Sequence, residues 1–440
     1  MRRMRGESGE STPAYYATCN RPRACAQPHR IISDDENFNM ATRVSLAVAF
    51  DGFLMSPHPL SAAALRAWLQ LAEAPGLTPA VLRVLLDAFG SPRALIDAPD
   101  DAIAAASSPA AAQAVRASER ADLDARAAAA LAWRDAPGNC IVPLGDPAYP
   151  PRLLDLHDPP PLLYVKGRVA LLHARGIAIV GSRHATPQGL ADATRFARIL
   201  SDAGLAIVSG LALGIDGAAH RGGLDGRSST IAVIGTGADL VYPARHRALA
   251  HEIAAHGAIV SEWPLGTPAR AAHFPQRNRL IAALASGALV VEAAPRSGSL
   301  ITARLANELG RDVFAMPGSI HAPLAQGCHA LIRDGAKLTA TPEDVLDEYG
   351  LRTESPGDAP PAAATSGDAA EQAVLAALGY GPVTYEWLAE RSGLSDDALH
   401  RALLALELAG RVASVAGGRF VRLGGPAAPQ LACGVLHSPA

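Results

Sequence analysis

Long apolar segments are missing from this sequence of 440 residues. Its longest apolar runs, such as residues 44–50, fall far short of the roughly 20 residues that a membrane-spanning helix requires. The basic start, residues 1–5, is followed by polar residues and not by the apolar stretch of a secretory signal. The sequence therefore predicts a cytoplasmic protein that has no membrane partner.

Cysteine is also scarce. The five cysteines are scattered and include no Cys-x-x-Cys pair, so the sequence indicates neither a disulfide framework nor a structural zinc site. Cys19, Cys25 and His29 are near enough in sequence to be weighed as metal ligands, but their spacing is not that of a zinc site. We predict no metal and no cofactor.

Lysine occurs only at positions 166 and 337, so nearly all basic residues are arginine. Together with the abundant alanine, this bias is typical of a GC-rich genome and indicates no particular function. The formal net charge of −3 excludes a protein that is basic throughout, such as a chromatin protein. It does not exclude nucleic-acid binding, because the local field around a binding surface attracts the phosphate backbone.

Apolar residues make up 49% of the chain, which is too long for one ordinary domain, so two or three domains with separate cores are expected. Shifts in composition and periodicity divide the chain into six segments. They are a disordered or untranslated extension (1–40, with Met40 as an alternative start), a helical domain of the SAM or helix-hairpin-helix type (41–135), a Rossmann-like domain (136–350), a linker (351–369), a winged-helix domain (370–423) and a tail (424–440).

Short apolar strands alternate with helical stretches, such as 187–203 and 300–309, in the central segment. This alternation predicts an α/β fold, namely an extended Rossmann-like, doubly wound parallel sheet with helices on both faces. The expected strands are 176–180, 205–208, 230–234, 258–260, 288–291 and 312–315.

The segment 370–423 combines three short helices with two strands, a pattern typical of a winged helix. Its expected recognition helix carries only His400 and Arg401 as basic groups and begins with Asp396 and Asp397. Contact with duplex DNA and contact with a protein therefore stay equally open for this domain.

The turns that follow the central strands are rich in small residues. In an open parallel sheet these turns lie at one edge, where helix N-termini present free N–H groups to an anion. We therefore predict an anion-binding rim built from four turns. Its candidate residues are Gly181, Ser182, Arg183, Ser209, Gly210, Gly214, Gly235, Thr236, Gly237, Ser297, Gly298 and Ser299.

Familiar enzyme templates do not fit this rim. The turn after the first central strand lacks Gly-x-Gly-x-x-Gly, and neither lysine lies in a phosphate-binding loop. No Gly-x-Ser-x-Gly elbow occurs. His251 and His256 are five residues apart and so do not share one helix face, as metalloprotease histidines do.

A basic, aromatic segment without any acid follows the fourth central strand. Guanidinium groups bind phosphate through paired hydrogen bonds, and an aromatic ring stacks on any base. With the rim, the segment predicts a groove that follows the backbone of a single strand. In the alternative interpretation Phe274 is core and the arginines are solvated. The residues concerned are Arg270, His273, Phe274, Arg277, Asn278 and Arg279.

In this order the motifs resemble the DNA-processing protein family DprA, also called Smf. The resemblance covers about residues 150–336 and includes a similar lead-in at 159–167. His246 departs from it, since the family pattern leads us to expect an asparagine there, and His329 departs similarly. The motifs are Val180-Gly181-Ser182-Arg183, Ser209-Gly210 with Gly214-Ile215-Asp216, Gly235-x-Gly237 with Tyr242-Pro243, Ser261-Glu262, Phe274-Pro275-x-Arg277-Asn278-Arg279, Val291-Glu292-Ala293, Ser297-Gly298-Ser299 and Pro317-Gly318.

The resemblance implies a protein without enzymatic activity that forms a homodimer, binds single-stranded DNA and loads the recombinase RecA onto it. The implied setting is natural transformation, in which incoming strands need protection. The resemblance also implies that Arg183, Arg277 and Arg279 contact phosphate and that Phe274 stacks on bases.

Two other functions stay open. The cytokinin-activating phosphoribohydrolases, a related Rossmann-like family, cleave nucleotides with a catalytic arginine and glutamate, but residues 295–303 carry no acid at the corresponding position. Asp216 and Glu292 are the acids to test as catalytic groups, and we expect both to brace loops or cap helices. The second alternative is a sensor that binds a small nucleotide and no DNA.

Overall fold

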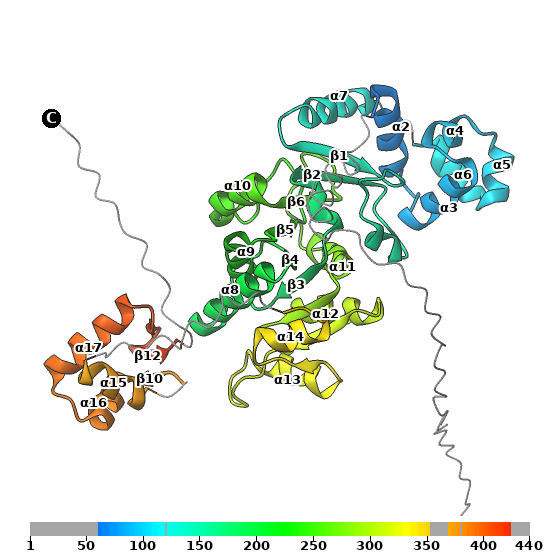
Figure 1. Ribbon diagram of the computed structural model, residues 1–440. Helices are drawn as coiled ribbons and strands as arrows, with labels where there is room; N and C mark the ends of the chain where they lie inside the picture. Colours follow the sequence, from blue (N-terminus) through cyan, green and yellow to red (C-terminus); the bar gives the residue numbers. More distant parts are fainter. Residues whose placement is uncertain (1–59, 119–120, 353–367, 379–380, 424–440) are drawn as a thin grey trace, which may run out of the picture. The chain divides into compact units, whose positions relative to one another are not determined.

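The computed structural model describes residues 60–118, 121–352, 368–378 and 381–423, whose helices and strands are drawn in Figure 1. The extension 1–40, the metal-ligand candidates within it and the tail 424–440 lie outside these residues, as does most of the linker. No helix within the described residues is long and apolar enough to cross a membrane.

Six short helices are described between residues 62 and 134. Ser61, Thr78, Ser91 and Ser108 begin four of them, and each side chain accepts a hydrogen bond from an amide of the first turn. The left-handed conformation of Gly90, with φ of 76°, ends the second. The helices are α2 (Ala62–Ala72), α3 (Pro79–Phe89), α4 (Pro92–Asp97), α5 (Asp100–Ala106), α6 (Pro109–Arg116) and α7 (Leu123–Arg134).

A nine-stranded sheet forms the centre of the fold, in the order β1-β2-β6-β5-β4-β3-β7-β8-β9. The predicted parallel pairing is confirmed for the neighbouring strands β6-β5-β4-β3-β7-β8-β9. The strands are β1 (Asn139–Pro143), β2 (Leu162–Gly167), β3 (Gly176–Val180), β4 (Ala206–Ser209), β5 (Thr230–Val233), β6 (Ala258–Ser261), β7 (Gly287–Val290), β8 (Asp312–Ala315) and β9 (Lys337–Leu338).

The sequence predicts a parallel sheet, but two strands at one edge are antiparallel. β2 pairs antiparallel with β6, and β1 pairs antiparallel with β2. Among the described residues no α-helix lies between β1 and β2 in the chain, and an antiparallel pair needs none, whereas a parallel pair needs a crossover connection that is usually helical. The segment before β3 thus adds two strands to this edge, and Ile141, Leu162 and Tyr164 of these strands pack in one core with residues of α2 and α7.

Helices cover both faces of the sheet (Figure 1). The alternating residues of β3 show the two faces: Ile177 and Ile179 belong to one hydrophobic core, and Ala178 and Val180 belong to the other. Helices α8 (Pro187–Asp202), α9 (Ile215–Asp225) and α14 (Pro342–Glu348) pack in the first core. Helices α11 (His273–Leu284), α12 (Ser299–Glu308) and α13 (Gln326–Arg333) pack in the second. α10 (Arg247–His256) packs in a smaller core of its own.

The C-terminal part has the predicted winged-helix elements and its own core, which includes Val374, Leu388, Leu399 and Leu406. Its three strands lie in the order β10-β12-β11. The elements are α15 (Ala369–Ala377), β10 (Val383–Thr384), α16 (Tyr385–Ser392), α17 (Asp396–Leu408), β11 (Val412–Val415) and β12 (Arg419–Arg422).

Candidate nucleic-acid interface

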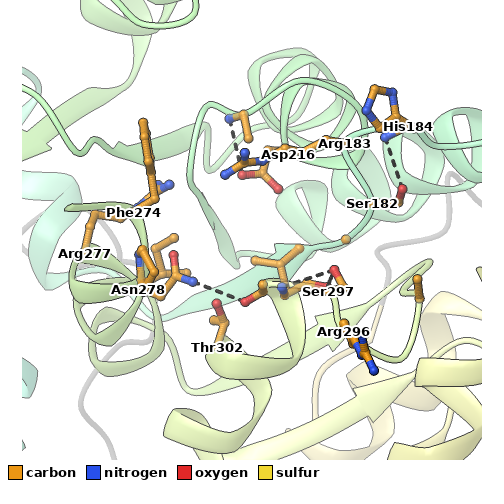
Figure 2. Close-up of a pocket in the computed structure, with 18 of the residues that line it drawn as sticks. Ser182, Arg183, His184, Asp216, Phe274, Arg277, Asn278, Arg296, Ser297 and Thr302 are labelled. Atoms are coloured by element: carbon orange, nitrogen blue, oxygen red, sulfur yellow. Dashed lines mark hydrogen bonds between the residues drawn. The ribbon is translucent and has the colours of Figure 1, made fainter. Parts of the chain in front are cut away.

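A cavity of about 760 Å³ lies where β3 and β7 are neighbours (Figure 2). The helices that follow these two strands, α8 and α12, pack on opposite faces of the sheet. This is the switch point of an open α/β sheet, where ligands bind beyond the carboxyl ends of the strands. The lining includes Gly181, Ser182, Arg183, His184, Asp216, Tyr242, Phe274, Arg277, Asn278, Arg296, Ser297, Gly298, Ser299 and Thr302.

Helix α11 presents one face to the cavity. Phe274, Arg277, Asn278 and Ile281 are three or four residues apart, so they share a side of the helix, and all four line the cavity. The side-chain Nδ2 of Asn278 donates a hydrogen bond to the backbone oxygen of Gly298, at 3.3 Å. This bond ties α11 to the turn after β7.

The ring of Phe274 lies beside both an aromatic ring and a guanidinium group. Its centroid is 5.5 Å from that of Tyr242, and Cζ of Arg183 is 5.5 Å from the Phe274 centroid. Tyr242 and Arg183 are exposed, and Phe274 is half-buried at the cavity wall. A base that enters here would meet a ring face for stacking and a cation for its phosphate. The interpretation of Phe274 as pure core does not fit this position.

Arg277 and Asp216 form the charged floor of the cavity. Arg277 is 3% exposed and donates a hydrogen bond from Nη1 to the backbone oxygen of Val233. Burial lowers the pKa of Arg277 to about 10, against the opposing effect of the Asp216 carboxylate, so the group stays cationic at neutral pH. Burial likewise raises the pKa of Asp216, and Arg277 and two backbone amides oppose this rise. The arginine is thus a fixed, buried charge and not a solvated one.

The turn between β7 and α12 supplies hydroxyl groups and a second exposed arginine. Ser297 Oγ and Ser299 Oγ are 2.7 Å apart, and Ser297 Oγ also accepts a hydrogen bond from the Ser299 amide at 3.3 Å. Arg296 is exposed at the rim of the cavity, whereas Thr302 is buried in its wall. This turn and Arg183 thus give the cavity positive charge and hydrogen-bond donors.

Several predicted residues support the cavity without lining it. Ser209 donates its hydroxyl to the Ile179 oxygen at 2.7 Å, and the Gly237 amide donates to the Thr267 oxygen at 2.9 Å. His273 is buried and stacks on Trp263 with ring centroids 3.7 Å apart. The hydroxyl of Ser209, the amide of Gly237 and the ring of His273 therefore make contacts within the protein. The residues outside the lining are Ser209, Gly210, Gly214, Gly235, Thr236, Gly237, His273 and Arg279.

Arg279 requires the clearest correction. It is 8% exposed, it forms an ion pair with Glu262, and its Nε lies 3.3 Å from Asp158 Oδ2. Two positions along α11 turn a side chain by about 200°, so Arg279 points away from the side that carries Arg277. The prediction that Arg279 contacts phosphate is therefore wrong on this geometry. Its guanidinium group instead pairs with acidic side chains of the protein itself.

The lining residues outside the predicted binding set include His184, Tyr242, Arg296 and Thr302. Arg296 directly precedes the predicted Ser297-Gly298-Ser299 turn, so its place in that turn is the signal that identifies it. Tyr242 belongs to the Tyr242-Pro243 motif, but its role is not evident from the sequence, because only the fold brings its ring to Phe274.

The two acids weighed as catalytic groups have bracing and capping roles, as predicted. Asp216 Oδ2 accepts hydrogen bonds from the amides of Gly210 and Ala212, at 3.1 and 3.3 Å. Glu292 accepts from the amide and the hydroxyl of Thr186, at 2.9 and 2.6 Å. Thr186 in turn caps α8. Both carboxylates thus hold loops in place around the cavity.

Comparison with known proteins agrees with this architecture. The family model described as DNA recombination-mediator protein A matches residues 140–350, and that of the DprA winged helix domain matches residues 358–418. Protein Smf of Escherichia coli (strain K12) is 42% identical over 299 residues, which are 67% of this chain and 80% of that protein.

Two comparisons with Streptococcus pneumoniae point the same way. DNA processing protein DprA of strain ATCC BAA-255 / R6 is 47% identical over 204 residues, which are 46% of this chain and 72% of that protein. The X-ray structure of DNA processing protein A (DprA) from this species superposes with a TM-score of 0.56 at 37% identity. That superposition covers 64% of this chain and 97% of the other. The chain therefore belongs to the DNA recombination-mediator protein A family, whose members are named DprA and Smf.

Proposed function

We propose that this chain binds single-stranded DNA in the cavity between β3 and β7 and passes the strand to the recombinase RecA, without a catalytic step. The observation that carries the proposal is the cluster of Arg183, Phe274 and Tyr242 at the mouth of the cavity, with Arg296 on the opposite turn. Exposed cations and ring faces are the two features with which proteins hold single strands.

The same cluster favours a single strand over a duplex. A base reaches the ring of Phe274 only if it is unstacked, and the bases of a duplex are stacked on one another. The arginines contact phosphate and sugar, which carry no sequence information, so binding should depend little on base sequence. Membership of a family of recombination mediators supports the RecA step and the setting in natural transformation. Homodimerisation is part of the same proposal.

The test is fluorescence anisotropy of labelled single-stranded and duplex oligonucleotides across a salt series. We expect salt-dependent binding that prefers the single strand. Arg183→Ala should weaken binding about tenfold and reduce the salt slope by about 0.7, as the loss of one phosphate contact predicts. The control is Arg198→Ala, because Arg198 is an exposed arginine on α8 that pairs with Asp202.

Failure to bind either oligonucleotide at low salt would overturn the proposal. An unchanged slope in Arg183→Ala would overturn the assignment of this residue. Free mononucleotides are added in a parallel series, because a cavity of about 760 Å³ also has room for one. Tight binding or turnover of a mononucleotide, with no strand binding, would indicate a sensor or an enzyme instead.

A further inference from the structure

Leu211 has an unusual backbone conformation in the turn between β4 and α9. Its φ is 58°, and among the described residues only Leu211 and Ser229 have positive φ without being glycine. A residue with a Cβ is strained in this region and persists there only when its surroundings hold it. The surroundings of Leu211 therefore need an explanation.

Two buried histidines bind both polar groups of the Leu211 backbone. The Leu211 amide donates to Nε2 of His220 at 3.2 Å, and Nδ1 of His246 lies 3.0 Å from the Leu211 oxygen. His220 is completely buried and His246 is 6% exposed. A Cβ on Gly217 would stand 2.7 Å from Cε1 of His246, so the glycine makes room for this imidazole.

The hydrogen bonds fix the protonation of both rings. Thr230 donates its hydroxyl to the Ile207 oxygen at 2.7 Å, so it accepts at the same Oγ1 from Nδ1 of His220, also at 2.7 Å. Nδ1 of His220 then carries the proton, which leaves Nε2 free to accept from Leu211. A carbonyl oxygen only accepts, so Nδ1 of His246 carries a proton as well. Burial, aided by the nearby His246 and then by the charges of Arg277 and Arg221, lowers the pKa of His220 to about 3, which agrees with a neutral ring.

The residues on either side of Leu211 contact the charged floor of the cavity. The amides of Gly210 and Ala212 donate to Asp216, and Gly210 lies against the guanidinium group of Arg277. Ala212, Asp216 and Arg277 line the cavity, whereas neither histidine does. The histidines therefore reach the cavity only through the backbone that they hold.

We infer that His220 and His246 are positioning residues for the nucleic-acid site: they clamp the Leu211 peptide and so hold Arg277 and Asp216, the charged floor of the cavity, in place. The effect on DNA binding rests on the proposed function, whereas the hydrogen bonds that hold the Leu211 peptide do not. A merely structural role, in which the two rings only fill the core, predicts that volume matters and hydrogen-bonding capacity does not.

The main test compares His246→Asn with His246→Leu in the full chain. Asparagine can place its Nδ2 where Nδ1 of histidine stands and keep the bond to Leu211, whereas leucine fills the space without a donor. With labelled single-stranded oligonucleotide we expect binding by His246→Asn within about twofold of the unaltered chain, and about tenfold weaker binding by His246→Leu. Both are measured well below their unfolding temperatures.

Loss of stability is controlled with Ser201→Ala. Ser201 donates a buried hydrogen bond to the Gly223 oxygen, at 3.2 Å, and does not line the cavity. This variant should lose stability and keep its affinity. Equal affinity of His246→Leu and His246→Asn, whether both bind normally or both are weakened, would overturn the inference.

A second measurement does not depend on DNA. Nitrogen-15 resonances of the histidine rings report tautomer and charge, and His220→Gln identifies the His220 signals. We expect a neutral ring protonated on Nδ1 throughout pH 5 to 8, roughly the range in which a free histidine titrates. A ring that titrates there, or one protonated on Nε2, would overturn the clamp. If the unaltered chain binds no DNA but this signature is found, the proposed function fails and the clamp stands.

Discussion

Gly210 lies so close to Arg277 that a Cβ at this position would stand 2.1 Å from Nη1 and 2.6 Å from Cζ. All of the nearest atoms belong to the guanidinium group, so a side chain at position 210 can be accommodated only by moving it. A substitution here displaces a charge without removing one.

Gly210→Ala is therefore expected to weaken single-strand binding roughly tenfold, since a hydrogen bond that involves a charged group contributes about 1.5–3 kcal/mol. The matched control is Gly298→Ala, because Gly298 also lines the cavity but has no atom within 4 Å of an added Cβ. Anisotropy titrations compare the affinities of the two variants for the labelled single strand. Equal weakening would mean that the added methyl groups obstruct the ligand and that Arg277 is not displaced.

Phe274→Leu separates stacking from charge. Stacking of a base on an aromatic ring contributes about 1–3 kcal/mol and involves no counterion. We expect about tenfold weaker binding with an unchanged salt slope, in contrast to Arg183→Ala. Tyr242→Phe retains the neighbouring ring and should bind normally. A reduced slope in Phe274→Leu would show that this substitution disturbs Arg183, which lies over the Phe274 ring.

Arg279→Met tests the corrected role of Arg279. Removal of the guanidinium group leaves Glu262 buried and unpaired, which typically costs about 3–5 kcal/mol of unfolding free energy. Burial already raises the pKa of Glu262 to about 7, so the loss should be smaller at pH 6, where the carboxyl group can take a proton. Urea unfolding at pH 6 and pH 8 measures both effects.

Restoration by a second change is the control for Arg279→Met. Glu262→Gln in the same chain should recover part of the lost stability, because it removes the unpaired charge. Strand binding at low temperature should be nearly unchanged. Normal stability combined with a reduced salt slope would instead return Arg279 to the list of phosphate contacts.

His220 should make the fold sensitive to acid. Its folded-state pKa of about 3 lies below the ordinary value of 6.5, so the unfolded chain binds the proton more readily. The contribution to stability is complete above pH 6.5 and is lost as the pH falls toward 3. At pH 5 the loss amounts to about 2 kcal/mol.

Comparison with His220→Gln isolates this contribution from those of the carboxyl groups. The difference in unfolding free energy between the two proteins should shrink between pH 7.5 and pH 5. A difference that does not depend on pH would contradict a buried, neutral His220.

The strands were predictable because buried parallel strands stand out in the sequence as short apolar runs. The bounds of β3 and β8 coincide with the predicted 176–180 and 312–315. β9 and β10 have two residues each, too few to form a pattern. β1 and β2 were not predicted as sheet strands, because their place at an antiparallel edge depends on the contact with β6.

The residue types of the site were predictable from the sequence, but the directions in which their side chains point were not. Small residues after parallel strands indicate a rim, and arginines with an aromatic residue indicate nucleic acid. The sequence does not state that residues 273–284 form a helix with Arg277 on the cavity side and Arg279 on the other. The partners that bury Arg279 come from distant segments, at Asp158 and Glu262.

The two ends of the central sheet bear on how copies of the chain can associate. Unpaired backbone donors and acceptors on an outer strand are a template for another chain, and proteins limit this risk with short strands, proline and lysine. Here one outer strand is the two-residue β9, which carries Lys337, and the other is β1, which ends in Pro143. Neither offers a long ladder for intermolecular pairing. A dimer of this protein would accordingly be joined through side-chain surfaces and not by extension of the sheet.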